Sequence, residues 1–266
     1  MKVVLFCGGQ GLRIREDAHG TPKPMVMVGY RPILWHVMRS YAHFGHKDFV
    51  LCLGYRGDVI KNYFLHYEEA LSNDFVMTGA RGTVDLLRTD IADWRITFVD
   101  TGLKSSIGQR LRAVQRYLAG EEIFLANYSD GLCDLQLPAM IDRFAATDAV
   151  GAFVAVKPSA SFHVVQHDDA GKVTSIGQVG GSALRINGGF FIFRRSIFNY
   201  LGPDDDLVDA PFQRLIAEGK LLAYPYDGFW ACMDTFKERQ LLEDLYSSGR
   251  APWMVWNGGR TELDQP

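Results

Sequence analysis

The sequence predicts an α/β fold built on a mainly parallel sheet with helices on both faces. Short apolar runs that suit buried strands alternate with segments of helical periodicity, most clearly in the first half of the chain. These segments follow one another at the spacing of β–α–β units, which place successive strands parallel. No apolar run reaches the roughly 18 residues that a membrane-spanning helix needs.

The first half of the chain alternates regularly between the two kinds of segment. We expect strands at residues 2–6, 48–54, 94–100 and 122–130, and helices at residues 32–44, 58–67, 107–117 and 138–147. The helix at 32–44 opens with a proline near its start, where a missing N–H costs nothing. Residues 68–93 form the least patterned stretch, and we interpret them as a mobile flap.

The second half is less regular. We expect strands at residues 150–156, 164–167, 188–193 and 221–226, and helices at residues 209–218 and 235–247. No linker rich in Pro, Gly or Ser, no block of like charge and no internal repeat divides the chain. One domain over residues 1–266 is therefore the simplest prediction.

Composition excludes several classes of protein. The formal net charge of -3 argues against broad affinity for nucleic acid or membranes. The N-terminal apolar run is interrupted by Gly8 and Gly9 too soon for a signal peptide, so we expect a cytoplasmic protein. The four cysteines form no CxxC pair, which argues against a zinc ribbon, and most of them are expected to be buried thiols.

A glycine-rich loop follows the first predicted strand. Gly8, Gly9 and Gly11 would let backbone N–H groups approach an anion, and Arg13 and Arg15 follow them. The loop is not a P-loop, because no Lys-Ser or Lys-Thr pair follows its last glycine, and it lacks the third glycine of a dinucleotide fingerprint. A tight turn without a ligand remains the alternative.

Lys23 strengthens the prediction of an anion site. It stands between Pro22 and Pro24, each of which fixes its own φ and restricts the residue before it. A lysine on so stiff a segment loses less entropy when it binds an anion.

Two acidic residues suggest a cation site. Asp130 comes at the end of a predicted buried strand, the position where open α/β sheets bind ligands, and Gly131 follows it. Carboxylate oxygens beside a close backbone suit a hard cation. Asp234 precedes the last predicted helix, so it is either a second cation ligand or the N-cap of that helix.

The chain resembles the sugar-1-phosphate nucleotidyltransferases, and most closely the glucose-1-phosphate cytidylyltransferases. The resemblance covers residues 3 to about 253 in the order of the family. It rests on the stretches GGQGLR, PKPMV, GYRPILWHVM, KDFVLCLGYRG, WRITFVDTG, NYSDG, INGGFFIF, GFWACMDT and GRAPW.

The resemblance implies a fold, a reaction and an assembly. The fold would be the Rossmann-like, mixed and mainly parallel sheet of the nucleotide-diphospho-sugar transferases. Its nucleotide half would cover about residues 1–135, its acceptor half about 136–235, and a C-terminal helix and tail 236–266. The reaction would be Mg²⁺-dependent transfer from a nucleoside triphosphate, CTP, to a sugar 1-phosphate with release of pyrophosphate. The family commonly forms homo-oligomers.

The resemblance also implies roles for matched residues. Arg13, Lys23, Asp130 and Asp234 would form the catalytic set. The glycine loop and Arg13 would bind the nucleotide phosphates, Lys23 the α-phosphate, and the two aspartates Mg²⁺. Further matched positions are Gly108 and Arg110 near the nucleotide, and Asn187 and Gly188 facing the sugar phosphate.

This sequence departs from the family mainly on the acceptor side. Gln178 stands where the family carries the lysine of a Glu-Lys-Pro element, and Arg185 is a candidate to replace that charge. His163 stands where a glycine allows close approach of the sugar, and Leu12 replaces a threonine in the glycine loop. We therefore keep two alternatives: the same chemistry on a cyclitol phosphate or phosphonate, and a catalytically silent nucleotide-binding homologue.

Overall fold

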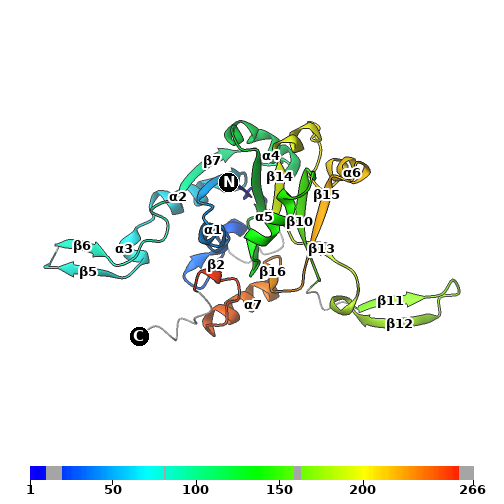
Figure 1. Cartoon of the computed structure of the whole chain (residues 1–266). Coiled ribbons are helices and arrows are strands. Elements are labelled where there is room, and N and C mark those ends of the chain that lie inside the picture. Colours follow the sequence, from blue (N-terminus) through cyan, green and yellow to red (C-terminus); the bar gives the residue numbers. More distant parts are fainter. Residues whose placement is uncertain (10–19, 81, 159–162, 258–266) are drawn as a thin grey trace.

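The computed structural model describes residues 1–9, 20–80, 82–158 and 163–257. Its central sheet has the strand order β13-β10-β14-β8-β1-β4-β7, and β15 also pairs with β10 (Figure 1). The strands are β1 (Lys2–Phe6), β4 (Asp48–Leu53), β7 (Arg95–Asp100), β8 (Ile123–Tyr128), β10 (Gly151–Val156), β13 (Ile186–Asn187), β14 (Phe191–Arg194) and β15 (Leu221–Tyr226).

The sheet is mixed and mainly parallel, as predicted. Strands β8, β1, β4 and β7 run parallel in one continuous block, and β10 and β15 form a second parallel pair. Strand β14 joins the two blocks and is antiparallel to both β8 and β10. The carboxyl ends of four neighbouring strands therefore meet at one edge of the sheet.

Helices cover both faces. They are α1 (Ile33–His43), α2 (Gly57–Leu65), α3 (Glu69–Ser72), α4 (Ile107–Ala113), α5 (Leu137–Ala145), α6 (Ala210–Ala217) and α7 (Phe236–Ser247). Successive residues of β1 enter different cores, because side chains alternate along a strand. Val3 and Leu5 pack with residues of α1, α5 and α7, whereas Val4 and Phe6 pack with residues of α4 and α6.

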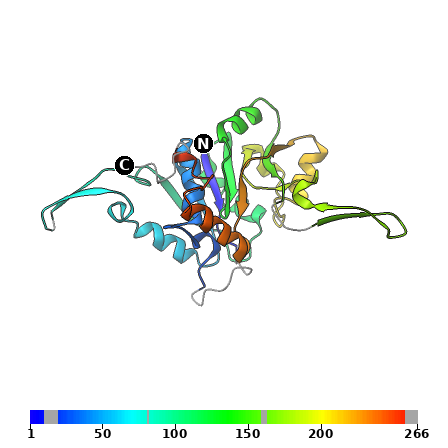
Figure 2. The same ribbon diagram turned by 90° about the horizontal axis from the view of Figure 1, so that it is seen from below.

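Four small two-stranded sheets surround this core. They are β2 (Met27–Val28) with β3 (Arg31–Pro32), β9 (Gly131–Cys133) with β16 (Trp230–Cys232), β5 (Phe75–Thr78) with β6 (Thr83–Leu86), and β11 (His163–His167) with β12 (Val173–Gln178). The last two pairs project from opposite ends of the molecule (Figures 1 and 2). We call β5–β6 the first arm and β11–β12 the second arm.

Several sequence predictions need correction. Residues 68–93, interpreted from the sequence as a mobile flap without regular elements, contain α3 and the two strands of the first arm, and their mobility stays a prediction. The helix expected at 107–117 is shorter, because a 3₁₀ turn, η3 (Gln115–Leu118), follows α4. The strand expected from residue 188 begins later, since Gly189 and Phe190 have φ of 77° and 51°, which no strand residue adopts.

The prediction for the cysteines is confirmed. Cys7, Cys52 and Cys133 are buried, and all four cysteines are free thiols. Among the residues that the structure describes, no helix is long and apolar enough to cross a membrane.

Candidate active site

The structure brings together three of the predicted catalytic residues. Lys23 lies in a 3₁₀ turn, η2 (Lys23–Met25), while Asp130 follows β8 and Asp234 follows β16. The Nζ atom of Lys23 contacts Oδ2 of Asp130 and lies 2.5 Å from Oδ1 of Asp234. Three segments far apart in the sequence therefore converge at the carboxyl edge of the sheet.

The small β9–β16 sheet places the two aspartates side by side. Gly131 pairs with Cys232 in this ladder, so the residue before β9 and the residues after β16 meet. The backbone N–H of Met233 donates to the carbonyl of Asp130 at 3.0 Å. Their positions are thus set by backbone pairing.

Asp234 is not the N-cap of α7. Thr235 holds that position, and its side chain accepts from the N–H of Glu238 while Glu238 accepts from the N–H of Thr235. This reciprocal capping box satisfies the helix start without the carboxylate of Asp234. The structure therefore excludes Asp234 as the helix cap, and its role as a cation ligand stays a prediction.

Lys23 is held as a cation. Burial alone would lower its pKa, but the charges and hydrogen bonds of Asp130 and Asp234 outweigh burial and raise the pKa above its usual value. Both flanking prolines are buried, so the segment is fixed as well as charged.

The two carboxylates fit a hard cation. Their oxygens converge on one ammonium nitrogen, which shows that a positive charge can sit between them. Mg²⁺ typically takes one or two protein carboxylates and fills its remaining positions with water and phosphate oxygens. No group of three or more His, Cys, Asp or Glu side chains suited to a metal occurs in the described parts of the chain.

The glycine loop begins at the same edge of the sheet. A Cβ atom on Gly8 would lie 2.0 Å from Nη1 of Arg110, so no other residue fits there without displacing that side chain. Among the described residues, none has an atom within 4 Å of the corresponding position on Gly9. The predicted phosphate-binding residues Gly11 and Arg13, with Leu12, fall outside the described residues.

Arg110 holds Gly8, the first glycine of this loop, by a hydrogen bond to its carbonyl. Its side chain is buried, and it donates to the carbonyl of Leu53 at 3.0 Å, to Oγ1 of Thr101 at 2.7 Å and to the carbonyl of Gly8 at 3.1 Å. These three acceptors lie at the carboxyl end of β4 and just beyond the carboxyl ends of β7 and β1. All three acceptors are neutral, so the guanidinium has no carboxylate among these hydrogen-bond partners. Its predicted contact with a nucleotide stays a prediction.

Gly108, the other residue predicted near the nucleotide, has a packing reason to be glycine. A Cβ atom there would lie 2.4 Å from the carbonyl oxygen of Asp205.

Two hydroxyl residues at the same edge were missed by sequence reasoning. Ser129 donates to the carbonyl of Phe6 at 2.9 Å, and Thr101 to the carbonyl of Leu53 at 2.7 Å. Each of these residues directly follows the last residue of a strand, and this position in the sequence could have identified it.

Asn187 and Gly188, predicted to face the acceptor, lie next to the site. Asn187 donates to the hydroxyl of Tyr128 at 3.3 Å, and the carbonyl of Gly188 accepts from Nε1 of Trp230 at 2.8 Å. Tyr128 ends β8 and Trp230 begins β16, the strands that lead to Asp130 and Asp234. These contacts connect the predicted acceptor side to the cluster around Lys23.

The other predicted acceptor residues lie elsewhere. His163 and Gln178 are exposed partners across the two strands of the second arm. Arg185 donates to the carbonyls of Ala155 and Tyr226 and pairs with Asp227 at 2.9 Å. Its guanidinium is therefore engaged in joining β10 to β15, and its role as a replacement for the missing lysine stays a prediction.

Comparison with known proteins agrees with this geometry. The model of the nucleotidyl transferase family matches residues 2–233. The chain is 38% identical over 258 residues to a glucose-1-phosphate cytidylyltransferase of Salmonella typhi, covering 96% of this chain and all of the relative. It is 26% identical to a mannose-1-phosphate guanyltransferase of Candida albicans, covering 91% of this chain and 63% of that protein.

Among solved structures, HddC from Yersinia pseudotuberculosis superposes with a TM-score of 0.64 at 17% identity, covering 92% of this chain and 99% of that one. This likeness concerns the fold alone. The family match over most of the chain and the relative that aligns along its whole length show the family directly. The chain is a nucleotidyltransferase and belongs to the nucleotidyl transferase family.

Proposed function

We propose that this enzyme transfers the cytidylyl group of CTP to a sugar 1-phosphate, with glucose 1-phosphate as the leading acceptor, and releases pyrophosphate. The observation that carries the proposal is the convergence of Lys23, Asp130 and Asp234 near the carboxyl end of β1, where the glycine loop begins. The choice of CTP and glucose 1-phosphate follows the relative that aligns along its full length. The use of a nucleoside triphosphate agrees with the predicted cytoplasmic location.

The chemistry needs positioning and charge neutralisation more than proton transfer. A phosphate monoester has a second pKa near 6, so it is an anionic nucleophile at neutral pH without a general base. Its oxygen forms a bond to the α-phosphorus of CTP while the bond to the bridging oxygen breaks, and pyrophosphate leaves with that electron pair. The main barrier is the approach of two anions, which fixed cations lower.

Lys23 is placed to serve the α-phosphate. Its ammonium group lies at the carboxyl edge of the sheet and contacts two carboxylates. The glycine loop follows β1 at the same edge. When Mg²⁺ is bound, Asp130 and Asp234 would hold it, and the ion would neutralise charge on the triphosphate. We expect Lys23 then to turn from the carboxylates to the phosphate.

The acceptor is tested by initial rates of pyrophosphate release. Four nucleoside triphosphates are combined with glucose 1-phosphate, other sugar 1-phosphates, cyclitol phosphates and phosphonates. CTP with glucose 1-phosphate is expected to be the fastest pair. Turnover of CTP with only a cyclitol phosphate or phosphonate would establish the alternative acceptor. Nucleotide binding without turnover would favour the silent homologue.

We also propose that the enzyme is a homo-oligomer in which the arms contact a second copy of the chain. In the first arm Phe75 lies opposite Leu86, and Met77 opposite Val84. Because side chains alternate, all four share one face of the hairpin. They are between 39% and 57% exposed. The opposite face carries Val76, Thr78, Thr83 and Asp85.

The second arm repeats this design. Val165 lies opposite Ile176, and Val173 shares their face, while Gln166 and Ser175 lie on the other. An isolated two-stranded hairpin is marginally stable in water, so each apolar face needs a cover. One chain carries two such faces at opposite ends, which lets copies of the chain cover each other.

Met77→Asp is expected to reduce the molar mass measured by light scattering, because it places a charge on the apolar face of the first arm. Thr83→Asp adds the same charge to the polar face of that arm and is expected to leave the mass unchanged. A monomeric wild type, or an unchanged assembly in Met77→Asp, would contradict this use of the arm.

A further inference from the structure

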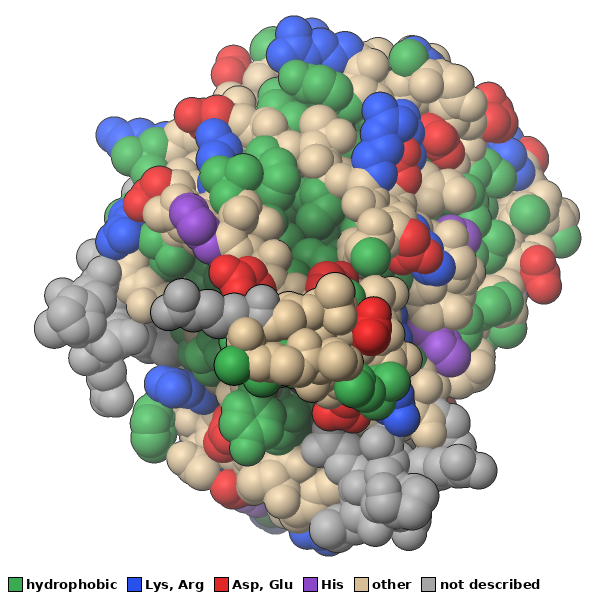
Figure 3. All heavy atoms as spheres, turned by 90° about the vertical axis from the view of Figure 1, so that its left-hand side faces the viewer, with side chains coloured by type: hydrophobic (Ala, Val, Ile, Leu, Met, Phe, Trp, Pro, Cys, Tyr) green, Lys and Arg blue, Asp and Glu red, His purple; other side chains and the backbone are tan. Residues whose placement is uncertain are grey.

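A second pocket lies away from the candidate active site, at the base of the first arm. It has a volume of about 650 Å³, within the range of small-molecule sites. Its walls come from α1, from the segments on either side of the first arm and from the C-terminal 3₁₀ turn, η6 (Val255–Asn257). Figure 3 shows the end of the molecule from which the first arm projects. None of Lys23, Asp130 and Asp234 lines this pocket.

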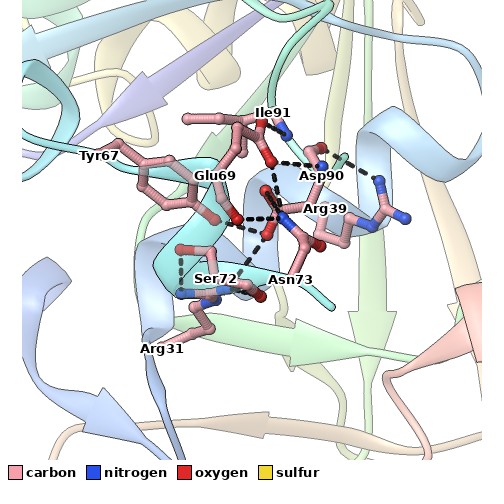
Figure 4. Close-up of polar contacts among 8 residues, drawn as sticks. All are labelled: Arg31, Arg39, Tyr67, Glu69, Ser72, Asn73, Asp90 and Ile91. Carbon is pink, nitrogen blue, oxygen red and sulfur yellow. Dashed lines mark hydrogen bonds and ion pairs between the residues drawn. The ribbon is translucent and has the colours of Figure 1, made fainter. Parts of the chain in front are cut away.

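The buried carboxylate in the pocket wall is already neutralised. Asp90 accepts from Nη2 of Arg31 at 3.2 Å, from the hydroxyl of Tyr67 at 2.5 Å and from Nδ2 of Asn73 at 3.3 Å (Figure 4). Arg31 also donates to the side chain and the carbonyl of Ser72. These contacts fix the wall and leave little charge on it.

Two other arginines of the pocket keep free donors. Within the described parts of the chain, Arg39 makes one hydrogen bond, from Nη1 to the carbonyl of Asp90 at 3.3 Å. Arg88 is exposed and makes no hydrogen bond or ion pair with the residues that the structure describes. Besides Asp90, the lining residues include one other carboxylate, Asp74, while burial lowers the pKa of His36 to about 4 and keeps it neutral. The balance favours an anionic ligand.

Aromatic side chains supply the rest of the lining. The rings of Trp35 and Trp256 lie 5.9 Å apart at 86°, and Tyr30 and Tyr246 extend this surface. Trp35 is 7% exposed, and its indole Nε1 is buried without a hydrogen-bond partner among the residues that the structure describes. A ligand with a ring would pack against this aromatic surface.

We propose that this pocket is a second binding site, selective for a phosphate ester that carries a ring, of the nucleoside phosphate class. Arg39 and Arg88 bind the phosphate, because guanidinium groups present paired donors that match its oxygens. Trp256 and the tyrosines pack against the ring. The site is independent of the proposed reaction, since it shares no catalytic residue with it.

The five tryptophans allow both sites to be observed in one experiment. In enzyme labelled with 5-fluorotryptophan, Trp35 and Trp256 report the pocket, and Trp230 reports the active site through its contact with Gly188. Substitution of each tryptophan by phenylalanine assigns the ¹⁹F resonances. CMP titrated into the intact enzyme is expected to shift the Trp35 and Trp256 resonances saturably, with an affinity different from that seen at Trp230.

Arg88→Ala and Arg39→Gln are each expected to weaken binding at Trp256 by about tenfold, the effect of losing a charged hydrogen bond. They should leave the response of Trp230 unchanged. Arg116→Ala removes an arginine outside the pocket and serves as the control. The proposal is overturned if CMP leaves Trp35 and Trp256 unmoved, or if inorganic phosphate binds as tightly as CMP. If CMP shifts the ¹⁹F resonance of Trp256 but not that of Trp230, the result contradicts the proposed function and leaves the second binding site supported.

Discussion

Asp130→Asn is expected to lower kcat for pyrophosphate release by about a thousandfold, the size of effect seen when a charged group is removed from the transition state. The substitution keeps the shape of the side chain but removes a charge that contacts Lys23 and that we assign to Mg²⁺. The backbone pairing that positions residue 130 is untouched. Fixed-time assays at saturating substrate concentrations measure the fall in kcat, and thermal unfolding checks that the fold is intact.

Asp134→Asn is the matched control. Asp134 follows β9, four residues after Asp130, and accepts from the hydroxyl of Tyr226 at 2.5 Å, away from Lys23. This variant is expected to keep kcat within about threefold of the wild type, because its carboxylate does not face the reacting phosphates. Near-normal turnover in Asp130→Asn would show that the carboxylate does not hold the metal.

Arg110→Met is expected to lower the free energy of unfolding by about 3 kcal/mol, because it removes three hydrogen bonds donated by a charged group, each worth about 1.5–3 kcal/mol, while relief from burying the guanidinium offsets part of the loss. Leu53, Thr101 and Gly8 would each lose the donor that Arg110 supplies. Gly8, at the start of the glycine loop, should lose its fixed position, so kcat/KM for the nucleotide should fall further than stability alone explains. Urea unfolding measures the first effect and initial rates the second.

Arg116→Met provides the comparison for Arg110. Arg116 lies on the following 3₁₀ turn, and its exposed side chain packs over the ring of Tyr117. Removing it should change stability by less than about 0.5 kcal/mol, as surface substitutions usually do. Equal effects of the two substitutions would mean that Arg110 does not support the loop.

The parts of the fold that bury apolar side chains were predictable from the sequence. Strands β1 and β4 and helix α1 begin and end within about two residues of the prediction, because their burial leaves a clear pattern. The arms left no such pattern, since every strand residue of the first arm is exposed. Their amphipathic faces become visible only when the cross-strand register is known.

The site was predictable where each residue has a local feature. Lys23 stands between prolines, and Asp130 follows a buried strand before a glycine, so both could be singled out. The link between Arg110 and the carbonyl of Gly8 spans 102 positions and has no local feature. Likewise, sequence spacing could not choose between Asp234 and Thr235 as the helix cap, because that choice depends on which side chain accepts from the helix.

The measurement that tests the central claim most directly is pyrophosphate release from CTP and glucose 1-phosphate, with Mg²⁺ and with EDTA in its place. Rapid release with Mg²⁺, abolished by EDTA and by Asp130→Asn, is the result that the cluster of Lys23, Asp130 and Asp234 predicts. Release that continues at the same rate in EDTA, or in Asp130→Asn, would contradict the assignment of these residues to a metal and phosphate site.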